Sequence, residues 1–258
     1  MIDFMKSIFG HLAFAVVIAT TVSAAPLRFM SGTKQVSLLE LYTSEGCSSC
    51  PPAEEWLNKL KASPDLWKDF VPVAFHVDYW NSLGWRDRWS SPEFSERQRA
   101  YARHWRSENI YTPGFVLKGQ EWRNWFGLRG APSSSGANVG VLEINSTNSV
   151  RWSASFAPTG GAKGAYETHA ALLVGGLSSE VKAGENRGRT LPHEFTVVEL
   201  VQFGMTSSSG LVHGKFLLNT ARHSSEKTLA IAAWVTHGSD LTPLQATGGW
   251  LIAPSPVK

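Results

Sequence analysis

The sequence predicts an α/β domain over residues 33–128 and, after it, a mainly antiparallel β region over residues 129–258. Alternating strand-like and helix-like patterns predict the first part, and they place the only two cysteines of the chain at a strand-to-helix junction. Short apolar runs separated by turn residues predict the second part. With 258 residues, 43% of them hydrophobic, the chain is long enough to bury a sizeable core.

The α/β part contains three strand-like runs and two helix-like segments. The runs are "VSLLELYT" (36–43), "VPVAFHVDYW" (71–80) and "GFVLKG" (114–119). Apolar residues recur at helical spacing over 53–60, directly after Pro51 and Pro52, where the first turn of a helix tolerates proline. Residues 91–105 form the clearest helix, because Ser91 is a suitable N-cap and a proline follows it. This alternation predicts helices that cover a sheet.

The amino-acid composition of the chain changes near residue 128. The segment "GLRGAPSSSGANVG" (127–140) has the composition of a linker or surface loop. Strand-like runs then follow with turn residues between them: "VGVLEIN", "VRWSASF", "YETHAALLVGG", "HGKFLLNT" and "TLAIAAWVTHG". The segment "LPHEFTVVELVQFG" (191–204) fits either a strand or a helix.

The first 24 residues resemble a secretory signal peptide. Lys6 precedes an apolar run from Leu12 to Val22, and small residues up to Ala24 give a cleavage pattern. An uncleaved membrane anchor is the alternative, although the run is short for a membrane span. We therefore expect an exported protein, periplasmic or secreted, that is not held in a membrane after cleavage. The formal net charge of +3 gives no case for nucleic acid as a partner.

The cysteine pair, Cys47 and Cys50, is the main candidate for chemistry. The amino end of a helix favours a thiolate, which is the nucleophile in disulfide exchange. Two-residue spacing lets the second thiol resolve a mixed disulfide formed by the first. We expect Cys47 to be the more exposed, attacking residue and Cys50 to be the buried, resolving one. Glu45 would oppose the formation of a thiolate.

Two other readings of the cysteine pair stay open. The pair could be a redox-silent disulfide in a protein that acts by binding. However, a disulfide that closes so short a loop adds little stability to the fold. The protein could also be a copper-delivery protein in which the pair binds copper with His76 as a third ligand, because thiolates suit a soft cation. A structural zinc site is not favoured, since one cysteine pair and no closely spaced histidine pair leave it short of ligands. No cofactor is predicted.

Three further features outside the pair bear on the site. Glu40 lies in an otherwise apolar strand, so it is either a proton acceptor near the cysteines or, as we favour, an edge-facing or ion-paired residue. Trp80 and Trp85 lie in the aromatic segment "HVDYWNSLGWRDRW" (76–89), which suits peptide binding or simply anchors a loop. The turn "GENRGRT" (184–190) could bind an anion through Arg187 and Arg189.

The strand, the Cys47-Ser48-Ser49-Cys50 motif and the helix after it resemble the thioredoxin fold. In that resemblance Thr112-Pro113, just before "GFVLKG", corresponds to the cis-proline loop that lies beside the redox pair and binds peptide. The sequence departs from the thioredoxins proper, because Gly46 and a Ser-Ser pair replace the residues of Trp-Cys-Gly-Pro-Cys and Leu41 replaces a buried aspartate.

A closer resemblance covers nearly the whole chain. The segments "ELYTSEGCSSCPPAE", "AFHVDYWNSLGWRDRWSSPEFSERQRAYA", "YTPGFVLKG" and "VKAGENRGRTLPHEFTVVEL" are similar to an exported, thioredoxin-like bacterial family known only as a domain of unknown function. This resemblance implies an exported thioredoxin-like domain, a mainly β C-terminal region and no settled activity. The Cys-x-x-Cys motif at a strand-to-helix junction, with Thr-Pro downstream, leads us to expect a thiol–disulfide oxidoreductase that acts on a protein thiol or disulfide. Cys47, Cys50 and Pro113 would be its catalytic residues, and Thr112, Trp80 and Trp85 would bind substrate.

Overall fold

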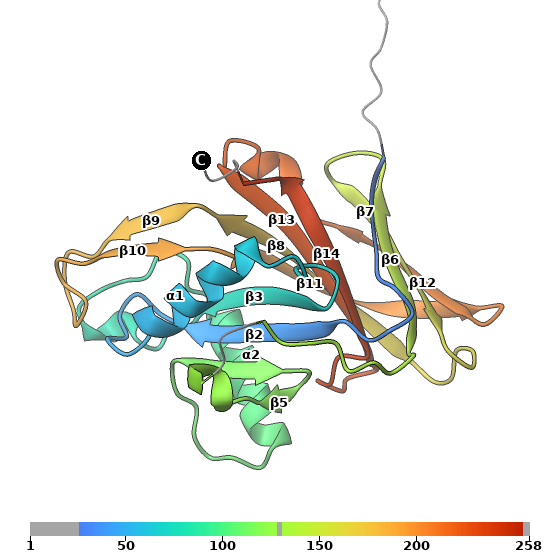
Figure 1. Ribbon diagram of the computed structural model, residues 1–258, viewed down its shortest axis with the longest axis horizontal. Helices are drawn as coiled ribbons and strands as arrows, with labels where there is room; N and C mark the ends of the chain where they lie inside the picture. The colour runs from blue at the N-terminus through green and yellow to red at the C-terminus, as the bar shows by residue number, and fades with distance from the viewer. Residues whose placement is uncertain (1–25, 128–130, 255–258) are drawn as a thin grey trace, which may run out of the picture.

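The computed structural model describes residues 26–127 and 131–254, and most of its regular structure is one large mixed sheet (Figure 1). Twelve strands belong to this sheet, in the order β1-β6-β7-β12-β11-β3-β2-β4-β5, and β8, β13 and β14 continue it from β11. The N-terminal strands are β1 (Leu27–Met30), β2 (Ser37–Thr43), β3 (Phe70–His76), β4 (Gly114–Leu117) and β5 (Gln120–Glu121). The later strands are β6 (Gly140–Ser146), β7 (Arg151–Pro158), β8 (Tyr166–Gly175), β11 (Thr196–Ser208), β12 (Leu211–Leu217), β13 (Thr228–His237) and β14 (Gln245–Ile252).

The predicted fold class, a thioredoxin-like α/β domain followed by a separate antiparallel β region, is wrong. The described residues are mainly β structure and contain two α-helices, too few to cover both faces of a separate parallel sheet. The free edge of β3 is instead completed by β11 from the C-terminal half, which runs parallel to it with Thr196 opposite Ala74. One hydrophobic core accordingly mixes both halves, since it joins residues of β2 and β3 to residues of β8, β11 and β13. The predicted boundary at residue 128 falls among residues that are not described.

The individual strands were predicted from the sequence more accurately than the overall architecture was. The three predicted strands of the N-terminal half correspond to β2, β3 and β4, and the five runs of the later half correspond to β6, β7, β8, β12 and β13. The ambiguous segment 191–204 is strand, divided between β10 (Thr190–His193) and β11. The predicted signal peptide, residues 1–24, lies outside the described residues.

The two helices begin as their sequences predict. Helix α1 (Pro51–Lys59) has proline in its first turn and Cys50 as its N-cap. Helix α2 (Pro92–His104) is capped by Ser91, whose side chain accepts a hydrogen bond from the backbone N–H of Glu93. Both helices contribute buried residues to the hydrophobic core that also contains the side chains of β2 and β3. Helix α1 runs across these strands in Figure 1.

A small second sheet forms an arm beside α1. It consists of β9 (Leu177–Glu180) and β10, which pair antiparallel, and the turn between them carries residues 181–189 (Figure 1). Asn58 of α1 donates a hydrogen bond to the carbonyl oxygen of Pro192 at 2.9 Å. This contact holds β10, from the C-terminal half, against the helix that follows the cysteines.

The parallel pair β2–β3 sets the position of the site. Their register places Thr43, the last residue of β2, opposite His76, the last residue of β3. Because the carboxyl ends of parallel strands lie at the same sheet edge, the loop with the cysteines and the loop after His76 meet there.

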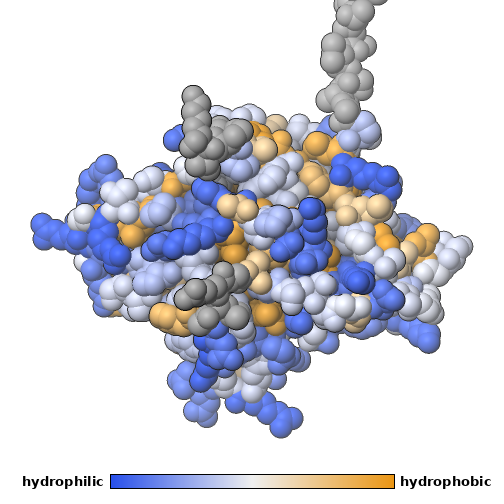
Figure 2. Space-filling model, viewed as in Figure 1, coloured by the Kyte–Doolittle hydropathy of each residue, from blue (hydrophilic) through white to orange (hydrophobic). Residues whose placement is uncertain are grey.

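The face shown in Figure 2 is mostly polar, and its apolar residues form small separate groups. Among the described residues, no helix is long and apolar enough to cross a membrane.

Candidate functional site

Cys47 and Cys50 form a disulfide at the junction of β2 and α1, with Cα atoms 5.4 Å apart. Both cysteines are completely buried. The prediction that Cys47 is the more exposed of the two is therefore wrong for this state of the protein. Ser48 and Ser49, between the cysteines, are exposed.

The segment around Pro113 lies directly beside the disulfide. The Oγ of Ser49 is 3.3 Å from the Sγ of Cys47, and it donates a hydrogen bond to the carbonyl oxygen of Thr112 at 3.4 Å. The peptide bond between Thr112 and Pro113 is cis. Trp80 donates from Nε1 to Oγ1 of Thr112 at 2.8 Å. The structure thus brings together five of the six predicted site residues: Cys47, Cys50, Thr112, Pro113 and Trp80.

Trp85 has a different neighbour from the other predicted residues. Its Nε1 donates a hydrogen bond to Oε2 of Glu45 at 2.7 Å, and its side chain is half-buried. Trp85 also packs against the turn of the arm, because a Cβ added to Gly184 would lie 3.2 Å from the Cβ of Trp85. Its contacts are those of a residue that anchors a loop.

The turn of the β9–β10 arm holds the cysteine loop in place. The side-chain amide of Asn186 donates to the carbonyl oxygens of Glu45 and Cys47, at 2.9 and 2.8 Å. Glu185 accepts a hydrogen bond from the backbone N–H of Ser48 at 3.1 Å. Asn186 is completely buried, whereas Arg187 and Arg189, the predicted anion-binding residues, are exposed. The sequence indicated a functional turn here but not the residues that make the contacts.

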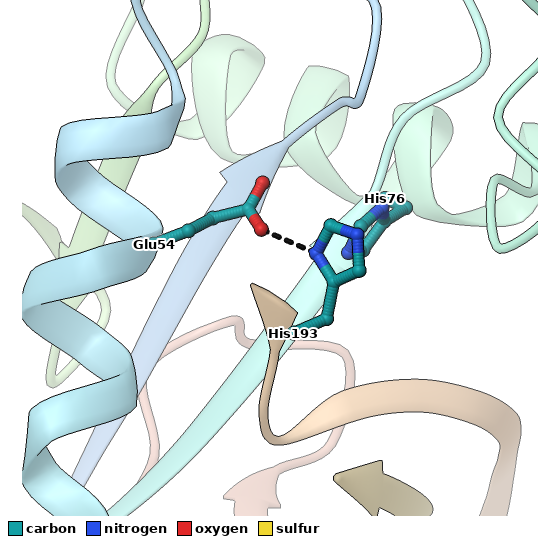
Figure 3. Close-up of side chains that lie close together, drawn as sticks. All are labelled: Glu54, His76 and His193. Atoms are coloured by element: carbon teal, nitrogen blue, oxygen red, sulfur yellow. Dashed lines mark hydrogen bonds and ion pairs between the residues drawn. The ribbon is translucent and has the colours of Figure 1, made fainter. Parts of the chain in front are cut away.

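A buried group of ionisable residues, which we call the His193 group, comprises Glu45, Glu54, His76, Asp87 and His193 (three of them are drawn in Figure 3). Nδ1 of His193 is 2.5 Å from Oε2 of Glu54, and its Nε2 is 3.2 Å from Oε1 of Glu45. Nδ1 of His76 is 2.7 Å from Oδ2 of Asp87. The two imidazole rings meet edge to face, with centroids 5.1 Å apart. These side chains come from the cysteine loop, α1, β3, the following loop and β10.

The carboxylates of this group favour protonated histidines. Burial by itself would lower the pKa of His193, but Glu54 and Glu45 outweigh it and raise that pKa to about 10. Burial would likewise lower the pKa of His76, and Asp87 raises it above its usual range. In return, the histidines lower the pKa of Glu54 and of Asp87 against the effect of their burial.

Part of the His193 group also has the arrangement of a metal site. One donor atom from each of Glu54, His76 and His193 lies within 4.8 Å of the other two. This set differs from the predicted copper site, which joined His76 to the two cysteines. Because the cysteines are bonded to each other, they supply no thiolate to a metal in this state.

Glu40 belongs to a separate buried group, with Tyr42, Arg97 and Tyr101. Arg97 donates from Nε to Oε2 of Glu40 at 2.8 Å, and the hydroxyls of Tyr101 and Tyr42 also donate to this carboxylate. The favoured interpretation of Glu40 as an ion-paired residue is confirmed.

The chain belongs to a family of proteins without an assigned activity. A family model described as "Protein of unknown function (DUF1223)" matches residues 38–236, which is most of the chain, so the protein is a member of that family. The predicted resemblance to a family known only as a domain of unknown function is thereby confirmed. No curated protein matches the chain.

Two solved structures resemble this one in fold. Protein AGR_C_4864 from Agrobacterium tumefaciens is 22% identical, and the alignment covers 88% of this chain and 99% of that one with a TM-score of 0.61. HBP35 of Porphyromonas gingivalis is 14% identical over 88% of this chain and 79% of that one, with a TM-score of 0.58. At these identities the likeness concerns the fold alone.

Sequence reasoning missed most of the His193 group. His193 lies more than 100 residues from His76 in the sequence, and Glu54 follows a helical pattern that makes it look like a surface residue. The one available signal was local: Glu54 and Ala53 fall on the same side of α1 as Leu57, which is buried.

Proposed function

We propose that the protein catalyses thiol–disulfide exchange with a polypeptide substrate through the Cys47–Cys50 couple. One observation carries this proposal: the only cysteines of the chain form a disulfide at the start of α1, in contact through Ser49 with the Thr112–Pro113 segment. A helix start favours the thiolate that leaves when such a bond is opened. A disulfide that closes so short a loop stabilises a fold only weakly, so stability is a poor explanation for it.

The exchange step transfers two electrons between the protein and its substrate. In the oxidising direction a substrate thiolate attacks Cys47, a mixed disulfide forms, and Cys50 leaves as a thiolate. A second substrate thiolate then attacks the substrate sulfur, Cys47 leaves, and the substrate holds the new disulfide. In the reducing direction the same steps run backwards, with Cys47 attacking and Cys50 resolving.

An aromatic cleft beside Pro113 supports a polypeptide as substrate. The cleft has a volume of about 520 Å³ and is lined by Tyr111, Pro113, Phe115, Trp122, Arg123, Trp125 and Phe126. The side chain of Phe126 is 79% exposed, which is unusual for phenylalanine and suits contact with an apolar side chain. Such a cleft would hold the residues next to a substrate cysteine.

Burial of the disulfide means that exchange requires the cysteine loop to open. The contacts that keep it closed are those of Ser49, Asn186 and Glu185. Ser48 and Glu185 are exposed, so their contact is exchangeable with water and contributes little to closure. We assign the main closing role to Asn186.

The test compares two serine variants in an assay of insulin reduction and dithiol oxidation. Cys47→Ser should abolish exchange, while Cys50→Ser should accumulate a mixed disulfide with the substrate through Cys47. Ser48→Ala, a change at an exposed neighbour, is the matched control and should keep its activity. Undiminished exchange by Cys47→Ser would remove the proposal.

The complete burial of both cysteines favours a second candidate, a redox-silent binding protein. In that case the aromatic cleft would bind its partner without any exchange, and Cys47→Ser would bind that partner as the wild type does. We further propose, from residues 1–24, that the protein is exported to an oxidising compartment, where a disulfide of this kind persists. N-terminal sequencing of the mature protein would detect cleavage after Ala24.

A further inference from the structure

We propose that Glu54, His76 and His193 bind a divalent transition-metal ion, for which zinc is the best match, at a site separate from the cysteines. The inference goes beyond the exchange function, because it uses none of the sulfur atoms. It rests on the ligand geometry, on an unpartnered buried nitrogen and on the carboxylate that orients His76.

The first observation is the donor set itself. One ligand atom from each of the three residues lies within 4.8 Å of the others, and the three side chains converge from α1, β3 and β10 (Figure 3). Two imidazoles and one carboxylate are a combination that zinc accepts, and in such sites a water molecule takes the fourth position. Ligands around a tetrahedral zinc lie roughly 3.4 Å apart, so small side-chain rotations would complete the geometry.

The second observation is an unpartnered nitrogen at the centre of the group. His76 is completely buried, its Nδ1 is engaged by Asp87, and its Nε2 has no hydrogen-bond partner. A buried polar atom without a partner is rare, because it loses its hydration and gains nothing in return. A cation bound at Nε2 would satisfy it.

The third observation is that a carboxylate holds His76 by the nitrogen that the metal would not use. Asp87 lies at 2.7 Å from Nδ1 of His76, which leaves Nε2 for the metal. Oε1 of Glu45 lies 3.2 Å from Nε2 of His193, but neither atom has a hydrogen-bond partner, so Glu45 does not fix His193 in the same way. A carboxylate on the outer nitrogen is the usual way in which proteins fix the orientation of metal-binding histidines.

The atoms of Glu54 fit the remaining role. Its Oε1 accepts a hydrogen bond from Thr43 at 2.5 Å, which fixes the carboxylate. Its Oε2 is hydrogen-bonded to Nδ1 of His193 at 2.5 Å, so a proton lies between these two atoms in the metal-free protein. Zinc requires neutral imidazole and ionised carboxylate, so it would take the place of that proton between the same two atoms.

A path to the site exists from the surface. Glu54 lines a cleft of about 260 Å³, together with Pro51, Pro52, Glu55 and residues 189–192 of the arm. The cleft opens beside the start of α1, so a hydrated ion can reach the carboxylate and a water molecule can remain as the fourth ligand.

The test titrates the untagged, chelator-treated full chain with zinc sulfate and measures stoichiometry, affinity and the shift in Tm. One equivalent should bind and raise the Tm. Glu54→Gln, His76→Gln and His193→Gln should each weaken binding by more than about 100-fold, and Asp87→Asn, which changes only an orienting residue, by about 10- to 100-fold. His169→Gln is the matched control, since His169 is a buried histidine stacked on Trp234 outside the site.

Two further measurements separate this proposal from its rivals and from the exchange function. The Cys47→Ser/Cys50→Ser double variant cannot catalyse exchange, but it should bind zinc as the wild type does. Failure of the exchange function would therefore leave the zinc proposal intact. X-ray absorption of the wild-type zinc complex should show nitrogen and oxygen neighbours and no sulfur, and this result does not depend on whether a variant folds. Absence of binding, sulfur in the first shell, or binding that survives all three ligand substitutions would overturn the proposal.

Discussion

The two buried groups of charged residues differ in how completely their hydrogen bonds are made. In the Glu40 group, Arg97 and two tyrosine hydroxyls donate to both oxygens of one carboxylate. In the His193 group, three carboxylates face two histidines, and Nε2 of His76, Nε2 of His193 and Oε1 of Glu45 have no hydrogen-bond partner. The residues of both groups are buried, and only Glu54 and Arg97 are slightly exposed.

The difference separates a structural group from one that can do chemistry. A buried ion pair with every donor and acceptor matched holds a single arrangement and resists change. A group with an unmatched atom and histidines can gain or lose a proton or bind a cation, because its charge is not fixed. The buried groups that could change their charge or bind a cation therefore lie at the ends of β2 and β3, whereas the middle of β2 carries the fully bonded Glu40 group.

The largest expected effect comes from breaking the Glu40 group. Arg97→Met would leave Glu40 buried without its cation, and loss of one partner of a buried pair costs about 3–5 kcal/mol of unfolding free energy. Urea unfolding measures this loss. Arg99→Met, on the exposed side of the same helix, is the control and should change stability by about 0.5 kcal/mol at most.

A small loss for Arg97→Met would contradict the description of the Glu40 group as structural. It would mean that Glu40 becomes protonated or hydrated at little cost, and the contrast with the His193 group would disappear.

The pH dependence of stability should differ between the groups in metal-free protein. The folded pKa of His193 is raised from 6.5 to about 10, so its stabilising contribution is complete below pH 6.5 and is lost as the pH rises towards 10. The loss should be on the order of 3 kcal/mol after allowance for its coupling to Glu54. Burial would lower the already high pKa of Arg97, but Glu40 raises this pKa above its usual value, so Arg97 stays charged throughout this pH range.

Thermal unfolding between pH 6 and pH 10, in the presence of a chelator, measures this dependence. His193→Gln should flatten the curve, and bound zinc should do the same because it replaces the titrating proton. A wild-type curve that stays level up to pH 10 would show that His193 is not held as a cation.

A smaller effect is expected at the contact between the arm and the cysteine loop. Asn186→Ala removes two hydrogen bonds to the carbonyl oxygens of Glu45 and Cys47, each with a net value of about 0.5–1.5 kcal/mol. If opening precedes reduction, dithiothreitol should reduce the disulfide roughly 5- to 150-fold faster in this variant. Stopped-flow reduction kinetics measure the change.

Asn109→Ala, a change at an exposed asparagine, is the control for this experiment and should leave the rate unaltered. An unchanged rate in Asn186→Ala would show that the arm does not keep the cysteines closed.

Local patterns predicted the strands and helices well, and they failed to predict how these elements assemble. The buried runs of β2 and β3 and the Ser91 cap of α2 follow from residue types within a few positions. The pairing of β3 with β11 depends on residues more than 100 positions apart, and no local pattern encodes it. This pairing is the reason that the expected thioredoxin-like domain does not exist as a separate unit.

The same limit applies to the site. Cys47, Cys50 and Pro113 could be selected because the spacing of the cysteines and the Thr-Pro step are short motifs. Glu54, His193 and Asn186 come together only through the docking of the arm on α1. The role of a single histidine such as His193 cannot be predicted from the sequence, because it depends on neighbours that only the fold brings close.

The reduction potential of the Cys47–Cys50 couple tests the central claim most directly. Equilibration of the mature protein with glutathione or dithiothreitol buffers, followed by counting of free thiols, measures it. The exchange function predicts a value between about −120 and −270 mV, the range of thiol–disulfide catalysts. A value below about −300 mV would mark a structural disulfide and would contradict the account.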